Sequence, residues 1–174
     1  MDLVVTVDAK APTRGRLTCS GAAFECVLGA SGVSIDKREG DGKTPSGRFL
    51  LRRIFYRADR VDLPRTSLPA SPLQESDGWC DAPEDPAYNC QLKHPYPARA
   101  ERLWRDDNRY NIIVVLGHND DPVVPGAGSA IFLHIAADDF RPTEGCIALR
   151  QADLLTVLAH CTPETKIYIE PPTA

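Results

Sequence analysis

Short runs of β-forming residues, separated by turn residues, recur along this chain and constrain what it can fold into. Leu3–Val7, Arg16–Cys19 and Phe24–Leu28 are such runs, and the last two flank the Ser-Gly-Ala-Ala stretch 20–23. Runs of this length bounded by turn residues predict strands, and a short glycine-containing spacer between two of them predicts a hairpin. The N-terminal part of the chain is therefore predicted to be a sheet.

The rest of the chain repeats the pattern and adds a helix. Ile112–Leu116 and Ala130–Ile135 are apolar runs that we expect to be buried strands, and further strands are predicted at Arg48–Tyr56 and Lys166–Ile169. Over Gln151–His160 the apolar residues follow helical spacing instead, which predicts a helix. The sequence thus predicts a mostly β fold with few helices.

Residues 1–174 are predicted to form a single domain. This length suits one hydrophobic core, and the sequence shows no internal repeat, low-complexity tract or domain boundary. The segment 59–100 holds seven of the fifteen prolines and is predicted to be loop-rich. A long segment of this kind is usually functional, and Trp79 and Tyr88 indicate that it packs on the domain.

Charge and hydropathy exclude several partners. The formal net charge of −4 is spread without a block of like charges, which argues against nucleic acid or an anionic membrane. No run approaches the roughly 18 apolar residues of a membrane span, and we expect a monomer. Residues 1–8 lack the basic start and long apolar stretch of a signal peptide. Taken literally, the chain is cytoplasmic or is a trimmed form of an exported protein.

The six cysteines leave two disulfides open. They include no CxxC pair, so a structural zinc site is not expected. Cys19 could pair with Cys26 across a hairpin, and Cys80 with Cys90 around a loop. The other reading is that these thiols are small buried apolar groups.

His134 and Cys146 are the candidate catalytic pair. His134 lies near the end of the apolar run 130–135, and Cys146 follows twelve residues later, directly after Gly145. Either residue alone is more often structural. Together they predict acyl transfer through a thioester, because a base can activate the thiol and a preceding Gly lets backbone N–H groups reach an oxyanion.

These residues carry a resemblance to a known family. Residues 143–149 read Thr-Glu-Gly-Cys-Ile-Ala-Leu, His134 precedes them, and residues 44–49 read Thr-Pro-Ser-Gly-Arg-Phe. In this order they resemble the motifs of the L,D-transpeptidase catalytic domain (YkuD-like) family, and the resemblance covers residues 17–169. It implies a single-domain β-sandwich or barrel.

Two residues depart from the family pattern. Glu144 stands where the family has His before the Gly, and Ala148 stands where it has Arg or Asn after the Cys. The loop between His134 and Cys146 is also short. These departures leave the nucleophile and base in place and imply a remodelled substrate site.

The resemblance implies a peptidoglycan reaction without a metal or organic cofactor. His134 takes the proton of Cys146, whose thiolate attacks a peptide carbonyl of a stem peptide, while backbone N–H groups around Gly145 hold the oxyanion. An amine of a second stem then forms a cross-link, either between two diaminopimelates or between L-alanine and diaminopimelate. The resemblance also implies a periplasmic or wall-associated protein, although the sequence shows no signal peptide.

Five residues are candidates for contacts with a stem peptide. Arg105 and Arg141 suit carboxylates, and another cation is expected because Ala148 replaces the family's polar residue. His118 follows an apolar run and is expected to line the same cleft, Trp79 suits a sugar or peptide, and Thr143 belongs to the motif. The alternative for each is a surface or packing role.

Other functions stay open at this stage. Water in place of the amine makes the same scaffold an L,D-carboxypeptidase or endopeptidase, and a merely buried Cys146 makes it a non-catalytic wall-binding module. Residues 40–44 read Gly-Asp-Gly-Lys-Thr, like the end of a phosphate loop. That loop needs a Gly where Lys37 stands, so nucleotide binding is not expected.

Overall fold

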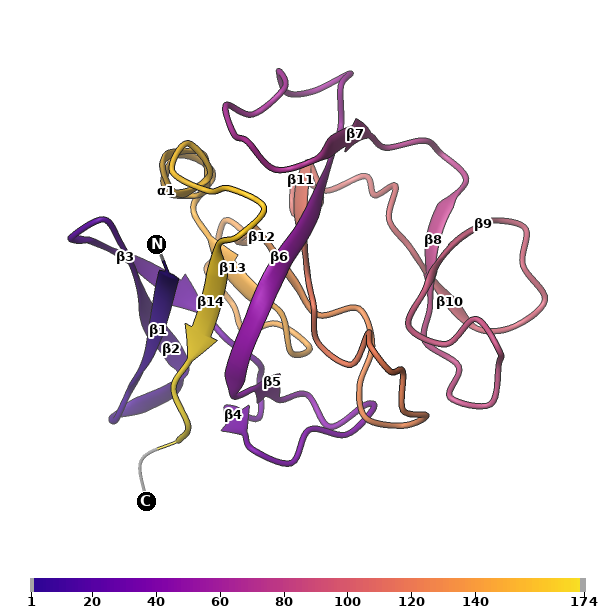
Figure 1. Ribbon diagram of the computed structural model, residues 1–174, viewed down its shortest axis with the longest axis horizontal. Coiled ribbons are helices and arrows are strands. Elements are labelled where there is room, and N and C mark those ends of the chain that lie inside the picture. The colour runs from indigo at the N-terminus through magenta and orange to yellow at the C-terminus, as the bar shows by residue number, and fades with distance from the viewer. Residues whose placement is uncertain (1, 173–174) are drawn as a thin grey trace.

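The computed structural model describes residues 2–172, whose regular structure is mostly strand (Figure 1). The nine strands of the largest sheet are, in chain order, β1 (Asp2–Asp8), β2 (Ala11–Cys19), β3 (Ala22–Val27), β6 (Gly47–Tyr56), β7 (Ala70–Pro72), β11 (Ile112–Leu116), β12 (Phe132–Ile135), β13 (Ile147–Leu149) and β14 (Lys166–Ile169). The predicted mostly β fold is confirmed, and the long apolar runs of the sequence match its strands closely.

The large sheet closes on itself. Its strand order is β11-β12-β13-β3-β2-β1-β14-β6-β7, and β6 also pairs with β11, so only β7 lies outside the ring. Closure leaves the strands of the ring without an open edge, which protects their backbone groups. The result is the barrel that the sequence resemblance implied.

One helix accompanies this barrel among the described residues. α1 (Gln151–Leu158) lies over one end of the barrel (Figure 1) and is two residues shorter than the predicted helix. Its Leu154, Val157 and Leu158 are buried in the same cluster as the barrel interior. No helix within residues 2–172 has the length and apolar character needed to cross a membrane.

The loop-rich segment contains more order than the sequence indicated. β8 (Asp77–Cys80), β9 (Gln91–Lys93) and β10 (Ala100–Arg102) form a separate three-stranded sheet beside the barrel (Figure 1). The predicted absence of clear structure over 59–100 is therefore wrong in part. Three- and four-residue strands between prolines are too short to show a period of two. The same applies to the two-residue strands β4 (Val33–Ser34) and β5 (Thr44–Pro45).

Both faces of the strands under this small sheet are buried. Along β11, alternate side chains enter the barrel interior: Ile112, Val114 and Leu116. The residues between them, Ile113 and Val115, join a second cluster outside the barrel with Phe132 and Leu103. Because side chains alternate between faces, burial on both sides explains why β11 is a continuous apolar run.

The structure contradicts the disulfide that the N-terminal hairpin suggested. In the β2–β3 register Cys19 lies opposite Ala22 and Cys26 lies opposite Gly15, so the two cysteines do not face each other. Cys80 and Cys90 are neighbours, and the Cys80 N–H donates to the Cys90 carbonyl at 2.9 Å. All six cysteines are free thiols in this structure.

Packing of β14 inside the barrel gives a first testable expectation. Ile167 is fully buried, whereas Leu63 is 59% exposed. Replacement of a buried Ile by Ala typically costs about 2–5 kcal/mol of stability through lost burial and a cavity. Ile167→Ala is expected to lower the free energy of unfolding in urea by this amount, and Leu63→Ala by less than about 0.5 kcal/mol. Equal effects would contradict the assignment of Ile167 to the core.

Candidate active site

Strand register brings His134 and Cys146 to one face of the sheet. β12 and β13 are parallel, with Leu133 opposite Ile147 and His134 opposite Ala148. Leu133 and Ile147 point into the barrel. Since neighbouring residues face opposite sides, His134 and Cys146 both face outward, as diagonal neighbours toward the small sheet.

A cavity of about 600 Å³ opens on this outer face. Its lining includes both members of the candidate pair and three of the predicted substrate residues, Arg105, Arg141 and Thr143. His118 and Trp79 are not among the residues that line it. The structure thus gathers most of the sequence candidates around the thiol.

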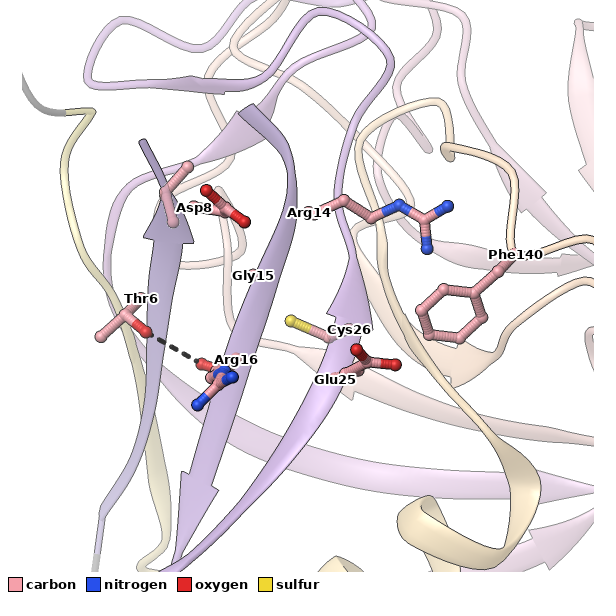
Figure 2. A pocket seen from close by; sticks show the side chains of 9 residues that line it. Thr6, Asp8, Arg14, Gly15, Arg16, Glu25, Cys26 and Phe140 are labelled. Carbon is pink, nitrogen blue, oxygen red and sulfur yellow. Dashed lines mark hydrogen bonds between the residues drawn. The ribbon is translucent and has the colours of Figure 1, made fainter. Parts of the chain in front are cut away.

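A second cavity, of about 380 Å³, lies against β1, β2 and β3 (Figure 2). Figure 2 shows Arg14 beside the ring of Phe140 and the Cys26 sulfur among the strands. No histidine lines this cavity, and burial raises the pKa of the Cys26 thiol to about 12. It therefore lacks the histidine base that the candidate pair supplies, and the first cavity is the candidate active site.

Cys146 is held as a protonated thiol. Its side chain donates to the Ala130 carbonyl at 3.3 Å, and its sulfur accepts the Phe132 N–H at 3.4 Å. The residue is only 8% exposed. Burial raises the pKa of Cys146 to about 12, and the nearby charge of Glu101 acts in the same direction. The thiolate is therefore scarce at neutral pH.

His134 is a neutral base with one nitrogen engaged. Its Nδ1 lies 2.8 Å from the Ile135 carbonyl oxygen, which accepts the Nδ1 hydrogen and leaves the lone pair of Nε2 available. The side chain is buried, and burial lowers its pKa to about 4. A backbone carbonyl thus orients this base, a detail that the sequence could not identify.

His134 and Cys146 lie on the same face but are not hydrogen-bonded to each other in this structure. Within the described residues, no hydrogen bond connects His134 with Cys146. Both are neutral near pH 7, because burial disfavours the thiolate and the imidazolium alike. Catalytic hydrogen bonds commonly tighten only when substrate is bound, so this arrangement favours proton transfer during attack over a preformed ion pair.

The turn that carries Cys146 is held by side-chain hydroxyls. Thr143 Oγ1 donates to the Cys146 carbonyl at 2.6 Å and accepts the Gly145 N–H at 3.2 Å. This N–H was predicted to face an oxyanion, and in this structure it faces Thr143. Thr143 therefore organises the turn as well as lining the cavity. Gly145 has a φ of 130°, and a Cβ there would lie 2.7 Å from the Lys43 carbonyl oxygen.

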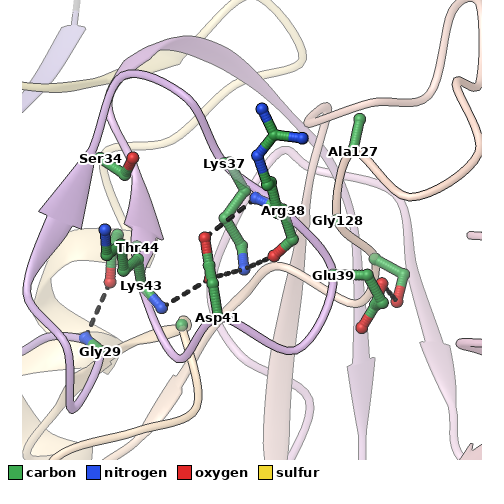
Figure 3. Close-up of polar contacts among 12 residues, drawn as sticks. Gly29, Ser34, Lys37, Arg38, Glu39, Asp41, Lys43, Thr44, Ala127 and Gly128 are labelled. Atoms are coloured by element: carbon green, nitrogen blue, oxygen red, sulfur yellow. Dashed lines mark hydrogen bonds and ion pairs between the residues drawn. The ribbon is translucent and has the colours of Figure 1, made fainter.

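Lys37, Glu39, Gly40 and Gly42 contribute to the lining of the cavity, and Figure 3 shows the polar contacts of this segment. The Lys37 side chain is 6% exposed, pairs with Asp41, and donates to the Arg38 carbonyl at 2.7 Å. Figure 3 also shows Thr44, whose hydroxyl accepts the Gly29 N–H at 2.8 Å. Burial raises the pKa of Cys146, and the positive charge of Lys37 offsets a part of this increase.

His118 and Trp79 support the walls of the site instead of lining it. His118 Nε2 lies 2.9 Å from the Ala127 carbonyl oxygen. Trp79 donates its Nε1 hydrogen to Asn89 at 2.9 Å and packs its ring edge-on against Phe132. The expectation that these two side chains contact substrate is not supported by their placement.

Two further residues that line the cavity, Tyr110 and Glu101, belong to no motif of the sequence. Tyr110 donates its hydroxyl hydrogen to Glu101 at 2.5 Å, and its ring lies edge-on to His134 with a centroid distance of 5.1 Å. Glu101 lies on β10 of the small sheet. It lies one residue beyond the loop-rich segment 59–100, and no sequence signal pointed to it. Within residues 2–172, no three His, Cys, Asp or Glu side chains gather as a metal site.

Comparison with known proteins adds one match. A family model of the L,D-transpeptidase catalytic domain (YkuD) matches residues 4–169, which is nearly the whole chain. No curated protein and no solved structure gives a significant match. The motifs at residues 44–49 and 143–149 lie inside the matched range.

The protonation states of the pair can be tested by alkylation. With a thiol pKa of about 12 and an imidazole pKa of about 4, the thiolate fraction of Cys146 should rise about tenfold per pH unit between about pH 6.5 and 9.5. The rate of iodoacetamide labelling at Cys146, measured by peptide mass spectrometry, is expected to follow this slope. A rate that is already constant across this range would show a preformed ion pair.

The close contact at Gly145 can be tested against a matched glycine. Gly145 and Gly21 both have positive φ, but a Cβ at Gly21 would meet nothing within 4 Å. Gly21→Ala is expected to cost about 1 kcal/mol of stability, from backbone strain alone. Gly145→Ala adds the clash with Lys43 and is expected to cost at least about 1 kcal/mol more in urea unfolding. Equal losses would show that the turn can relax.

Proposed function

We propose that this chain, which belongs to the L,D-transpeptidase catalytic domain family, is a cysteine acyltransferase that cross-links peptidoglycan stem peptides. The observation that carries the proposal is the shared cavity, where the buried thiol of Cys146 and the free Nε2 of His134 face the same space. A nucleophile, an oriented base and room for a peptide are the requirements of acyl transfer through a thioester.

The first half-reaction forms the acyl-enzyme. His134 Nε2 takes the proton of Cys146 as the sulfur attacks a peptide carbonyl of the donor stem, so the scarce thiolate never has to accumulate. The C–N bond of the donor breaks, and His134 returns the proton to the departing amine. The Ile135 carbonyl keeps the imidazole in the required tautomer.

The oxyanion of this step requires nearby donors. In the family pattern these are backbone N–H groups beside the nucleophile, and the Gly145 N–H is within one residue of Cys146. Thr143 accepts that N–H at 3.2 Å, which is a long contact. We infer that the incoming oxygen competes with the Thr143 hydroxyl for it.

The cavity charges suit a peptide that carries both amines and carboxylates. Its lining includes four cations, Lys37, Arg105, Arg109 and Arg141, and four acids, Glu39, Asp81, Glu101 and Glu144. Diaminopimelate, which carries both kinds of group, is the expected acceptor. Its partner is either a second diaminopimelate or L-alanine. This substrate places the protein in the periplasm or at the cell wall.

Hydrolysis on the same scaffold is the second candidate. Eight of the residues that line the cavity are charged, so water can enter it and compete with the amine for the thioester. The protein would then act as an L,D-carboxypeptidase or endopeptidase with the same nucleophile. The two candidate functions differ only in the second substrate, which is an amine for the transpeptidase and water for the hydrolase.

Product analysis with a matched thiol control tests the proposal. Cys161 is also a buried thiol whose pKa burial raises to about 12, but it lies inside the barrel. The wild type and Cys161→Ala are expected to form muropeptide dimers and a covalent adduct, and Cys146→Ala neither, by mass spectrometry. Trimmed monomers without dimers would favour the hydrolase. Products from Cys146→Ala would reject the nucleophile, and no adduct in the wild type would favour a non-catalytic module.

A further inference from the structure

Glu101 is a carboxylate in the active-site cavity that has no ion pair among the described residues. One of its oxygens accepts the Tyr110 hydroxyl at 2.5 Å, and its other carboxylate oxygen takes part in no hydrogen bond within residues 2–172. The side chain lines the same cavity as Cys146 and His134. Burial raises the pKa of Glu101 above its ordinary value, although the Tyr110 hydrogen bond and the charge of Arg105 act in the opposite direction.

Neither Arg105 nor Arg109, which line the same cavity, forms an ion pair with Glu101 within residues 2–172. Arg105 and Arg109 both bind Asp107, each with an Nη2 to Oδ2 distance of 2.8 Å. A charge withdrawn from water is stabilised by an opposite charge and hydrogen bonds. Glu101 is therefore left without an ion-pair partner, and an ammonium group on a substrate can supply one.

We propose that Glu101 binds the ammonium group of the acyl acceptor and takes the proton that this group must lose before it attacks. The inference rests on the proposed function, and it assigns a catalytic residue to the second half-reaction. An amine is protonated near pH 7 and is then not nucleophilic. A carboxylate at the cavity wall both attracts the ammonium group and accepts its proton.

Every proton that the acceptor amine loses in this step has a stated acceptor. The ammonium group gives one proton to the Glu101 carboxylate and becomes a neutral amine. Its nitrogen attacks the thioester carbonyl, forming a C–N bond, and His134 takes a second proton from that nitrogen. The C–S bond breaks, His134 protonates the Cys146 thiolate, and Glu101 releases its proton to water. The net products are the amide, the resting thiol and one proton.

The placement of Glu101 is consistent with separate roles for Glu101 and His134 as acceptors of the first and second proton. Tyr110 lies between the two proton acceptors, with its hydroxyl on Glu101 and its ring edge on His134. The negative charge of Glu101 also acts on the thiol and raises the pKa of Cys146. The competing explanation is that Glu101 merely positions Tyr110, and thereby His134.

Two amines of different charge separate these explanations. Diaminopimelate presents ammonium groups, whereas hydroxylamine is mostly uncharged near pH 8 and needs no base to become a nucleophile. Glu101→Gln keeps an oxygen for Tyr110 but loses the charge and the basicity. Glu84→Gln, at an exposed position outside the cavity lining, is the matched control. Each protein is given a tetrapeptide muropeptide as donor and one amine, and the products are quantified by mass spectrometry.

Glu101→Gln is expected to lower kcat/KM for diaminopimelate by at least about tenfold, with transfer to hydroxylamine and formation of the Cys146 adduct changed less than about twofold. Glu84→Gln should change neither. Equal losses with both amines would show a purely positioning role and overturn the proposal, as would no loss with either. A wild type that forms no adduct would instead refute the proposed function itself.

A second variant covers the case in which Glu101→Gln fails to fold. The Tyr110 hydroxyl lowers the pKa of Glu101, so Tyr110→Phe should raise that pKa while retaining the ring against His134. The acidic limb of the pH profile for transfer to diaminopimelate is expected to move to higher pH, whereas the profile with hydroxylamine stays in place. An unmoved limb, or equal movement with both amines, would overturn the proposal.

Discussion

The parallel pairing of β12 with β13 is the contact on which the site depends. It sets His134 beside Ala148 and directs both it and Cys146 out of the barrel. A shift of either strand by one residue would turn its functional side chain into the apolar interior. Leu133 and Ile147 resist such a shift because both are fully buried there. The core of the barrel thus specifies the geometry of its outer face.

Burial of the pair has a chemical consequence. Burial on this face of the barrel raises the pKa of Cys146 and lowers that of His134. Under the proposed mechanism, Cys146 stays a protonated thiol until the substrate is in place and His134 takes its proton. Ala148, where the family has a polar residue, sits fully buried beside His134 and packs with Val27 and Phe140. This small side chain adds no further charge next to the base.

Both departures from the family pattern, Glu144 and Ala148, line the active-site cavity. Glu144 is exposed and lines the cavity, and Glu101 enters from the small sheet on the other side. Arg105 and Arg109, which also line the cavity, are both paired with Asp107. Within residues 2–172, Glu101 and Glu144 form no ion pair, whereas these two arginines are both paired.

The sequence by itself determined the strands that have long apolar runs and singled out His134 and Cys146 as a candidate pair, because period and motif are local properties of the chain. It missed the three-residue β13 and the small sheet, whose strands are too short for a period to show. Only the tertiary structure placed Glu101 and Tyr110 at the site and moved His118 out of it. Such neighbours come from segments far apart in sequence, and their proximity depends on barrel closure and packing, which no local pattern records.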